Sequence, residues 1–150
     1  MAKMVDIGTK PDVYRRATAS GLIRLKPETV RAIRTGRIEK GDVLAAAEIA
    51  ALQAMKAVWQ VLPHTHPIPI TAASVTFDTG TDRVVATTTV EATYKTGVEM
   101  EALYGVTVAL LTIWDMAKPF EKDRGGQYPT ARIEDIRVVS KEKGRRGARA

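Results

Sequence analysis

The sequence of 150 residues contains no cysteine and few aromatic residues. The absence of cysteine excludes disulfide bonds, thiolate metal sites and a cysteine nucleophile. Phe, Trp and Tyr together make up 5% of the chain, which leaves few side chains for stacking nucleic-acid bases. No uninterrupted apolar run reaches the roughly 20 residues that a membrane-spanning helix needs, and the first residues show no signal-peptide pattern. We therefore expect a cytoplasmic protein that does not cross a membrane.

The composition indicates one globular domain with a hydrophobic core. Hydrophobic residues account for 45% and charged residues for 27% of the chain, which is ordinary for a folded domain. The net charge is +6, but residues 137–150 alone carry six basic residues and one acidic residue. The high isoelectric point is therefore a property of this last segment, which weakens a prediction of nucleic-acid binding.

The order of hydrophobic patterns and chain breakers predicts three parts. Residues 1–13 are expected to form a mobile arm, residues 14–140 a single catalytic domain, and residues 141–150 a basic disordered tail. The tail could bind RNA non-specifically, or it could fold over a ligand that bears phosphate groups. The sequence leaves these alternatives open.

Period-2 and period-3.6 patterns predict the elements of the domain. The expected elements are a strand over 16–25, a short helix over 27–35, a helix over 42–62, strands over 71–78 and 83–94, a helix over 98–118 that Pro119 ends, and a strand over 132–140. This order predicts the α+β class: a ferredoxin-like β-α-β-β-α-β fold with an extra short helix, its helices on one face of an antiparallel sheet.

The first candidate site lies near the end of the helix predicted over 98–118. Asp115 and Lys118 are three positions apart, so their side chains meet on one helix face. A surface ion pair explains this spacing, and so does a carboxylate and an amine that exchange protons in a desolvated cleft. Glu101 lies on the same stripe, about 21 Å from Asp115 along the helix axis. If both acids serve one pocket, either the ligand is long or two subunits contribute.

Two loops supply further candidates. Both histidines, His64 and His66, lie in a proline-flanked loop, where they could be structural, ligate a metal or act as positioned imidazoles. No Asp or Glu lies in that loop to complete a metal site, so we predict no metal. Lys40 precedes the expected helix N-cap at Asp42, where it is either a solvated lysine or a partner for phosphate. Standard glycine-rich nucleotide-binding motifs are absent.

Several segments together resemble a known family. They are residues 4–7 (Met-Val-Asp-Ile), 40–43 (Lys-Gly-Asp-Val), 63–67 (Pro-His-Thr-His-Pro), 95–103 (Lys-Thr-Gly-Val-Glu-Met-Glu-Ala-Leu) and 115–118 (Asp-Met-Ala-Lys). Their identity and order resemble the cyclic pyranopterin monophosphate synthases of molybdenum cofactor biosynthesis, the C proteins of that pathway. The segment 95–103 is the most specific, and the resemblance extends over nearly the whole chain.

The resemblance implies an activity, an assembly and a set of residues. The family converts a GTP-derived cyclic dihydroguanosine triphosphate into cyclic pyranopterin monophosphate with release of pyrophosphate, as a lyase without a redox cofactor. It implies a hexamer, a trimer of dimers with the pocket at the dimer interface. The matching catalytic residues are Asp115, Lys118 and Lys40, and the matching substrate-binding residues are His64, Thr65, His66, Met100 and Glu101.

Some positions depart from the family pattern and keep two alternatives open. Thr65 stands where the family usually has cysteine, Glu48 where it has arginine, and Pro119 where it has a small helical residue. The main alternative is a small basic ferredoxin-like module that binds RNA through its tail. The other is an oligomeric structural protein whose site has decayed. Ring rearrangement requires several proton transfers, which Asp and Lys side chains can mediate, and we therefore predict the enzyme.

Overall fold

Alternating small apolar and polar residues build the central strand of the structure. In this computed structural model, which describes residues 1–144, β1 spans Val13–Arg24. Its buried positions are Ala17, Ala19, Gly21 and Ile23, and the residues that alternate with them are partly exposed, as the sequence predicts. The remaining elements are α1 (Pro27–Arg34), α2 (Val43–Met55), α3 (Val58–Val61), β2 (Ala72–Thr79), β3 (Arg83–Tyr94), α4 (Glu99–Glu121) and β4 (Arg132–Gly144).

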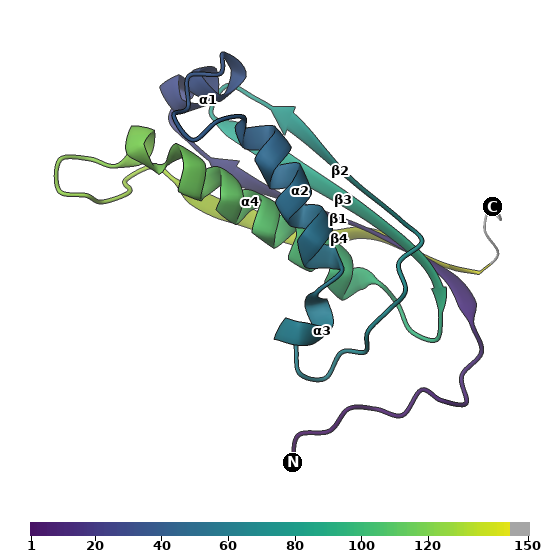
Figure 1. The fold of residues 1–150 in the computed structure, drawn as a ribbon. Helices are drawn as coiled ribbons and strands as arrows, with labels where there is room; N and C mark the ends of the chain where they lie inside the picture. Colours follow the sequence, from purple (N-terminus) through teal and green to yellow (C-terminus); the bar gives the residue numbers. More distant parts are fainter. Residues whose placement is uncertain (145–150) are drawn as a thin grey trace.

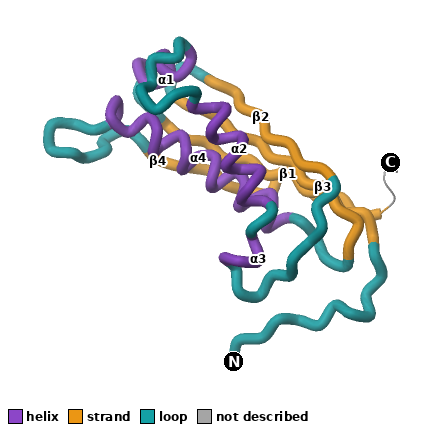
Figure 2. Tube along the Cα trace, viewed as in Figure 1, coloured by secondary structure: helices purple, strands orange, loops and turns teal. Residues whose placement is uncertain are grey.

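The four strands form one antiparallel sheet in the order β2-β3-β1-β4. Helices α2 and α4 lie side by side on one face of this sheet, and α1 lies at the end where α4 finishes (Figure 1). The tube view shows the loops gathered mainly at the two ends of the sheet (Figure 2). The predicted α+β, ferredoxin-like fold with helices on one face is confirmed.

Two glycines allow α4 to approach α2 and the sheet closely. A Cβ atom at Gly105 of α4 would lie 2.7 Å from Met55 Cε of α2, and one at Gly21 of β1 would lie 2.9 Å from Val106 Cγ1 of α4. The buried Thr88 hydroxyl of β3 donates to the Ala102 carbonyl at 2.7 Å, so this polar group is satisfied within the core. The core between α2, α4 and the sheet is therefore dense, and α4 is fixed along its length.

Helix α2 ends earlier than the predicted boundary at residue 62. The N–H groups of Lys56 and Ala57 bond to carbonyls only three residues back, at 3.2 and 3.0 Å, which closes the helix as a tight turn. The chain then forms the single turn of α3, in which Val58 is buried and Val61 is exposed. The prediction of one continuous helix was wrong because the chain turns after Met55 to keep Val58 in the core.

Helix α4 continues past Pro119, which was predicted to end it. Its last residue, Glu121, is buried and anchors the helix end to α1. Glu121 Oε2 accepts a hydrogen bond from the Lys26 backbone N–H at 3.0 Å and another from the Thr29 hydroxyl. These bonds satisfy donors at the start of α1 and hold the residues after the proline in helical geometry.

Strand β4 is longer than predicted. It continues beyond Ser140 to Gly144, with Lys141 opposite Ala17 and Gly144 opposite Tyr14. The boundary of the sheet was misplaced because charged residues on an edge strand resemble a solvated tail. Residues 145–150 of the predicted tail lie outside the described residues.

The predicted mobile arm also ends earlier, because β1 starts at Val13. The Lys95 ammonium, just after β3, donates to the Lys10 carbonyl at 2.9 Å and lies 3.8 Å from Asp12 Oδ1. The end of the arm is therefore attached to the sheet, while the prediction of mobility for residues 1–13 stays a prediction.

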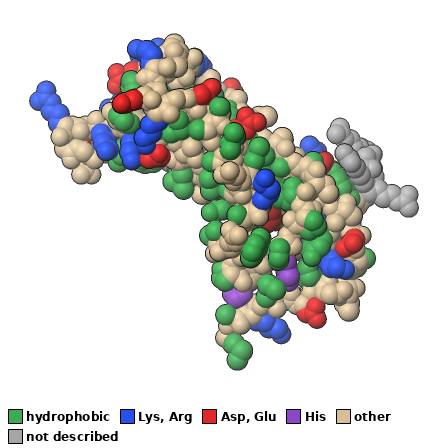
Figure 3. Space-filling view, in the orientation of Figure 1, with side chains coloured by type: hydrophobic (Ala, Val, Ile, Leu, Met, Phe, Trp, Pro, Cys, Tyr) green, Lys and Arg blue, Asp and Glu red, His purple; other side chains and the backbone are tan. Residues whose placement is uncertain are grey.

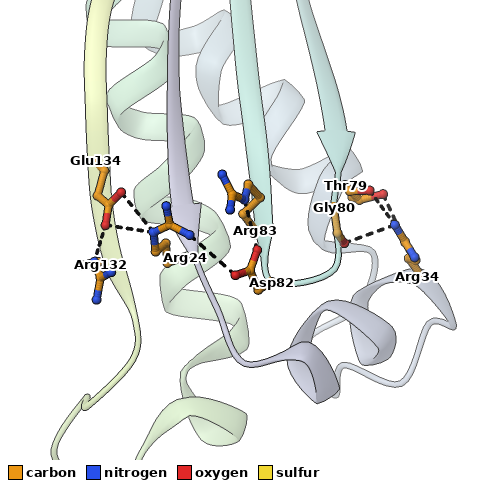
Figure 4. A network of polar contacts seen from close by, with 8 residues as sticks. All are labelled: Arg24, Arg34, Thr79, Gly80, Asp82, Arg83, Arg132 and Glu134. Carbon is orange, nitrogen blue, oxygen red and sulfur yellow. Dashed lines mark hydrogen bonds and ion pairs between the residues drawn. The ribbon is translucent and has the colours of Figure 1, made fainter.

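A network of polar side chains fixes the end of the sheet beside α1 (Figure 4). Arg24 Nε at the end of β1 donates to both Glu134 carboxylate oxygens of β4, each at 3.1 Å. The Arg24 guanidinium also lies 3.6 Å from Asp82 in the β2–β3 turn. Arg34 of α1 donates to the Thr79 hydroxyl of β2 at 3.2 Å. Strand ends and α1 are thus held together.

By length and composition, α4 is apolar enough to cross a membrane. Half of its most apolar window is buried inside this domain, where α4 packs on the sheet and on α2. A buried core helix accounts for this apolar composition.

Candidate active site

Three charged side chains meet at the C-terminal end of α4, and we call Lys40, Asp115 and Lys118 the amine cluster. Lys118 lies about one helical turn after Asp115, and its Nζ donates to Asp115 Oδ1 at 3.0 Å. Lys40 Nζ, from the loop between α1 and α2, donates to Asp115 Oδ2 at 2.9 Å and to the Asp115 backbone carbonyl at 3.2 Å. The structure thus joins all three predicted catalytic residues around one carboxylate.

Local geometry brings Lys40 to this position. Ile38 is buried and fixes the loop on the core, and the Gly41 N–H bonds back to the Ile38 carbonyl at 3.1 Å. Gly41 has a φ of 115°, which side-chain-bearing residues rarely adopt, so a glycine is required at this turn. Asp42 then caps α2 by accepting from the Ala45 N–H at 3.0 Å. Lys40 is held between a buried anchor and a helix cap.

Hydrogen bonds within the amine cluster favour the charged forms of Asp115 and Lys118. Hydrogen bonds from Lys40 and Lys118 lower the pKa of Asp115, and the bond to Asp115 raises the pKa of Lys118. The exposed fractions of the Lys40, Asp115 and Lys118 side chains are 45%, 57% and 38%. One chain alone therefore does not provide the desolvated cleft predicted from the sequence, since α4 turns this end of its stripe to solvent.

Two cavities flank the amine cluster. One of about 420 Å³ is lined by Leu111, Trp114, Asp115, Lys118, Tyr128 and Ile133. In its wall the Trp114 and Tyr128 rings meet edge to face, with centroids 5.1 Å apart. The other, of about 520 Å³, is lined by Arg37, Ile38, Glu39, Lys40, Met116, Pro119 and Phe120. An apolar wall beside charged donors is typical of a small-molecule site, and sequence reasoning missed Trp114 and Tyr128 because they come from separate elements.

The predicted substrate-binding residues meet elsewhere, and we call them the histidine cluster. They line a cavity of about 160 Å³, whose predicted members are His64, Thr65, His66, Met100 and Glu101. The Thr65 hydroxyl donates to the Leu62 carbonyl at 2.8 Å, which stabilises the turn that presents the histidines. The loop after α3 and the start of α4 therefore supply this cluster together.

Glu101 is the buried acid of the histidine cluster. Only 4% of its surface is exposed. Burial raises the pKa of Glu101 to about 7, and the nearby charge of Glu99 also raises it. Its carboxyl is therefore poised to gain or lose a proton near neutral pH.

An ion pair beside Glu101 was missed by sequence reasoning. Lys141 Nζ of β4 lies 2.8 Å from Glu99 Oε1 at the start of α4. Burial alone would raise the pKa of Glu99, but the hydrogen bond from Lys141, the Glu99 backbone amide and nearby positive charges together lower it. Lys141 had been assigned to the tail, so no sequence pattern connected it with Glu99.

The two clusters lie at opposite ends of α4. Glu101 and Asp115 are 14 positions apart, which corresponds to about 21 Å along the helix axis. In the space-filling view the histidine side chains lie at one end of the molecule, and a group of acidic and basic side chains lies at the other (Figure 3). The structure thus joins the predicted residues into two groups, each complete, but does not join the groups within one chain.

The described part of the chain offers no group of three or more His, Asp or Glu side chains that could hold a metal ion. The amine cluster offers ammonium and carboxylate groups, and the histidine cluster offers imidazole and carboxyl groups. These groups transfer protons and bind anions.

The fold and these clusters define a ferredoxin-like protein with two lysines bonded to one aspartate near the end of its long helix. The chain belongs to the MoaC family, which matches residues 4–144. This match confirms the family resemblance that the five short segments predicted.

Relatives agree with this assignment. The chain is 60% identical over 141 residues to a Pyrococcus furiosus protein named probable cyclic pyranopterin monophosphate synthase, covering 94% of this chain and 90% of that protein. A Thermococcus kodakarensis protein of the same name is 58% identical over 142 residues, covering 95% and 91%. A Methanothermobacter thermautotrophicus protein, 55% identical over 141 residues and covering 94% and 89%, is named as a probable accessory protein of that synthase. These matches support the predicted enzyme and not the RNA-binding alternative.

Proposed function

We propose that this chain is a cyclic pyranopterin monophosphate synthase. It takes the GTP-derived cyclic dihydroguanosine triphosphate, rearranges the base, forms the cyclic phosphate and releases pyrophosphate, which makes it a lyase. The observation that carries the proposal is the amine cluster, in which side chains 75 positions apart in the sequence meet around Asp115 at 2.9 and 3.0 Å. A simple surface ion pair requires no third group.

The amine cluster supplies the proton transfers. The carboxylate of Asp115 accepts hydrogen bonds from both Lys40 and Lys118 before substrate binds. Each ammonium donates a proton to a substrate atom and becomes an amine, which is the acceptor for the next proton transfer. Because both lysines are bonded to the Asp115 carboxylate, a proton taken up by one lysine can pass to the other through this carboxylate. Ring opening and ring closure are thus served by the same three side chains.

The cluster also attracts the phosphates of the substrate. Two ammonium groups and one carboxylate leave a net positive charge, and Arg37 lies in the wall of the adjoining cavity. Ammonium and guanidinium groups form charge-assisted hydrogen bonds with phosphate oxygens. Excluding water strengthens these bonds, so the site works best when this exposed end of α4 is covered.

We further propose that a partner subunit provides that cover. In a symmetric dimer, the histidine cluster of one subunit would face the amine cluster of the other, and symmetry would create two such sites. Exposed apolar side chains next to both clusters, Leu111 and Met100, support an interface there. Three dimers would then build the hexamer. We also propose the cytoplasmic location that was predicted from the sequence.

Incubation with the GTP-derived intermediate tests the function. The purified protein should release pyrophosphate and yield a product that gives a fluorescent pterin after oxidation. Lys118→Ala should abolish both signals without changing the oligomeric state, because a central donor is lost. Lys122→Ala, one turn further along the chain and exposed, is the matched control and should keep full activity. Full activity of Lys118→Ala would remove the assignment.

A further inference from the structure

The hydrogen-bond ladder of α4 is interrupted at the amine cluster. In an α-helix the N–H of each residue bonds to the carbonyl four residues earlier, so residue 119 would serve the carbonyl of Asp115. Pro119 has no N–H and leaves that carbonyl without its usual donor. Lys40 Nζ lies 3.2 Å from this carbonyl oxygen.

Lys40 therefore has two acceptors on a single residue. Besides the carbonyl, it donates to the Asp115 carboxylate at 2.9 Å. A lysine ammonium sits on a flexible chain of four carbons, and this one is 45% exposed, so one contact alone would let it pivot. Two contacts to atoms of one residue fix both the position and the direction of the ammonium group.

Pro119 lies inside α4, where a proline does not stabilise the helix. Proline inside a helix removes a backbone bond and crowds the preceding turn. The helix nevertheless continues to Glu121, whose buried carboxylate is bonded to the first turn of α1. Pro119 also lines the cavity of about 520 Å³ in which Lys40 lies. The bonds of Glu121 therefore hold the helix after the proline, and Pro119 shares a cavity wall with Lys40.

We propose that Pro119 is a positioning residue for Lys40. Its missing N–H leaves the Asp115 carbonyl free to bind the Lys40 ammonium. This carbonyl and the Asp115 carboxylate together hold Lys40, and we call these two acceptors the Lys40 seat. The catalytic part of this inference rests on the proposed function, while the seat itself is a structural statement that can be tested without substrate.

Substitution of the proline tests the seat directly. Pro119→Ala restores an N–H that competes with Lys40 for the Asp115 carbonyl. In the full-length assembled protein, the melting temperature should rise, and Lys40 should react several-fold faster with an acylating reagent, measured by peptide mass spectrometry. Lys122 should react at an unchanged rate and serves as the internal reference. Unchanged reactivity of Lys40 would overturn the proposal, whatever the catalytic activity turns out to be.

Kinetics then test the link to catalysis. Lys40 loses one of its two hydrogen bonds and remains exposed, so a typical net hydrogen bond sets the scale, and we expect a kcat roughly threefold to tenfold lower in Pro119→Ala, with KM changed less than about twofold. Pro27→Ala is the matched control, because Pro27 occupies the first turn of α1, where an N–H has no carbonyl four residues back within the helix. An unchanged kcat in Pro119→Ala, in a preparation that makes the pterin product, would contradict the positioning role.

A backbone substitution separates the missing N–H from the proline ring. The α-hydroxy acid analogue of alanine at position 119 has the alanine side chain but forms an ester, which also lacks the N–H. Both the slow acylation of Lys40 and the normal kcat should return in this variant. If the ester behaves like Pro119→Ala, the ring rather than the vacant carbonyl positions Lys40, and the proposal fails.

Discussion

The two ends of α4 hold titratable groups in opposite ways. At the C-terminal end, the amine cluster lies in contact with water, and each charged group is paired. At the N-terminal end, Glu101 is buried, and its pKa is raised to about 7 because burial disfavours the charged form. One helix thus carries a set of groups stabilised by hydrogen bonds and an acid controlled by desolvation. Contacts with a partner subunit would change the surroundings of the amine cluster most, because its side chains are more exposed to water than Glu101.

The difference predicts how each end responds to mutation. Groups that are held by bonds depend on their partners, so a change of one atom at Asp115 should affect all three members of the amine cluster. A group that is controlled by burial depends on its surroundings, so a change at Glu101 should appear in the pH dependence of stability.

Asp115→Asn should reduce activity nearly as far as Lys118→Ala. The amide removes the negative charge between Lys40 and Lys118 and accepts hydrogen bonds through only one of its two side-chain atoms. We expect kcat to fall by a factor of about 100 or more, since general acid–base groups contribute roughly 10²–10⁴-fold. Measurement of initial rates of pyrophosphate release checks this. Asp78→Asn, on the exposed side of β2, is the control, and equal losses in both variants would refute a specific role for Asp115.

Glu101→Gln should change the pH dependence of stability. The folded protein holds the Glu101 proton up to a pKa of about 7, whereas the ordinary value is 4.5. The native state therefore binds more protons between these values, and its stability falls as pH rises from about 4.5 through 7, by on the order of 2–3 kcal/mol. Denaturant unfolding at several pH values measures this fall.

The Gln variant cannot lose a proton, so its stability curve should lack the fall between pH 4.5 and 7. Glu39→Gln, in an exposed loop, serves as the control and should keep the slope of the parent protein. A slope that persists in Glu101→Gln would show that another group titrates, and the contrast between the two ends of α4 would then be lost.

High salt should separate the two ends again. The exposed amine cluster binds an anionic substrate through charges that salt screens within about 8–10 Å at physiological ionic strength. We expect KM to rise several-fold between low salt and about 0.5 M salt, because salt weakens the attraction between exposed charges and the substrate. The pH midpoint of Glu101-linked stability should hardly move, because a buried group is screened less. Steady-state kinetics and unfolding under the same salts compare the two, and equal shifts would contradict the difference in exposure.

Lys141→Ala should have the smallest effect. It removes the 2.8 Å ion pair with Glu99 and so raises the pKa of Glu99, which lies beside the histidine cluster. We expect a change of about twofold to threefold in KM with kcat nearly constant, since partly exposed pairs contribute roughly 0.2–1 kcal/mol. Lys143→Ala on the same strand is the control. A large loss of kcat would place Lys141 in the chemistry itself.

Much of this architecture follows from local sequence patterns. The alternation in β1 and the apolar stretch of α4 predicted the sheet and the buried helix, because side-chain periodicity reflects which face is buried. The errors concern ends of elements. The helix continues past Pro119 because Glu121 is bonded to α1, and β4 continues to Gly144 because β1 pairs with it. Such contacts join segments that are distant in sequence, and local patterns do not contain them.

The site was predictable in its members but not in its arrangement. The resemblance identified the eight residues, and the spacing of Asp115 and Lys118 predicted their contact. Neither revealed that Lys40 also bonds to the Asp115 carbonyl, since this depends on a loop 75 positions away. Helix geometry alone predicted the separation of Glu101 from Asp115, since residues 14 helical positions apart cannot converge on one small centre. It left open whether one long ligand or two subunits connect them.

If one site uses the two clusters from different subunits, two variants that are each inactive should regain activity when they are mixed. Lys118→Ala damages only the amine cluster and Glu101→Ala only the histidine cluster. After the two proteins are dissociated and reassembled together, a mixed dimer has one site with both defects and one intact site. We expect recovery of about a quarter of the parent activity from equal amounts, given random pairing in symmetric dimers. No recovery, with mixed dimers verified by native mass spectrometry, would contradict it.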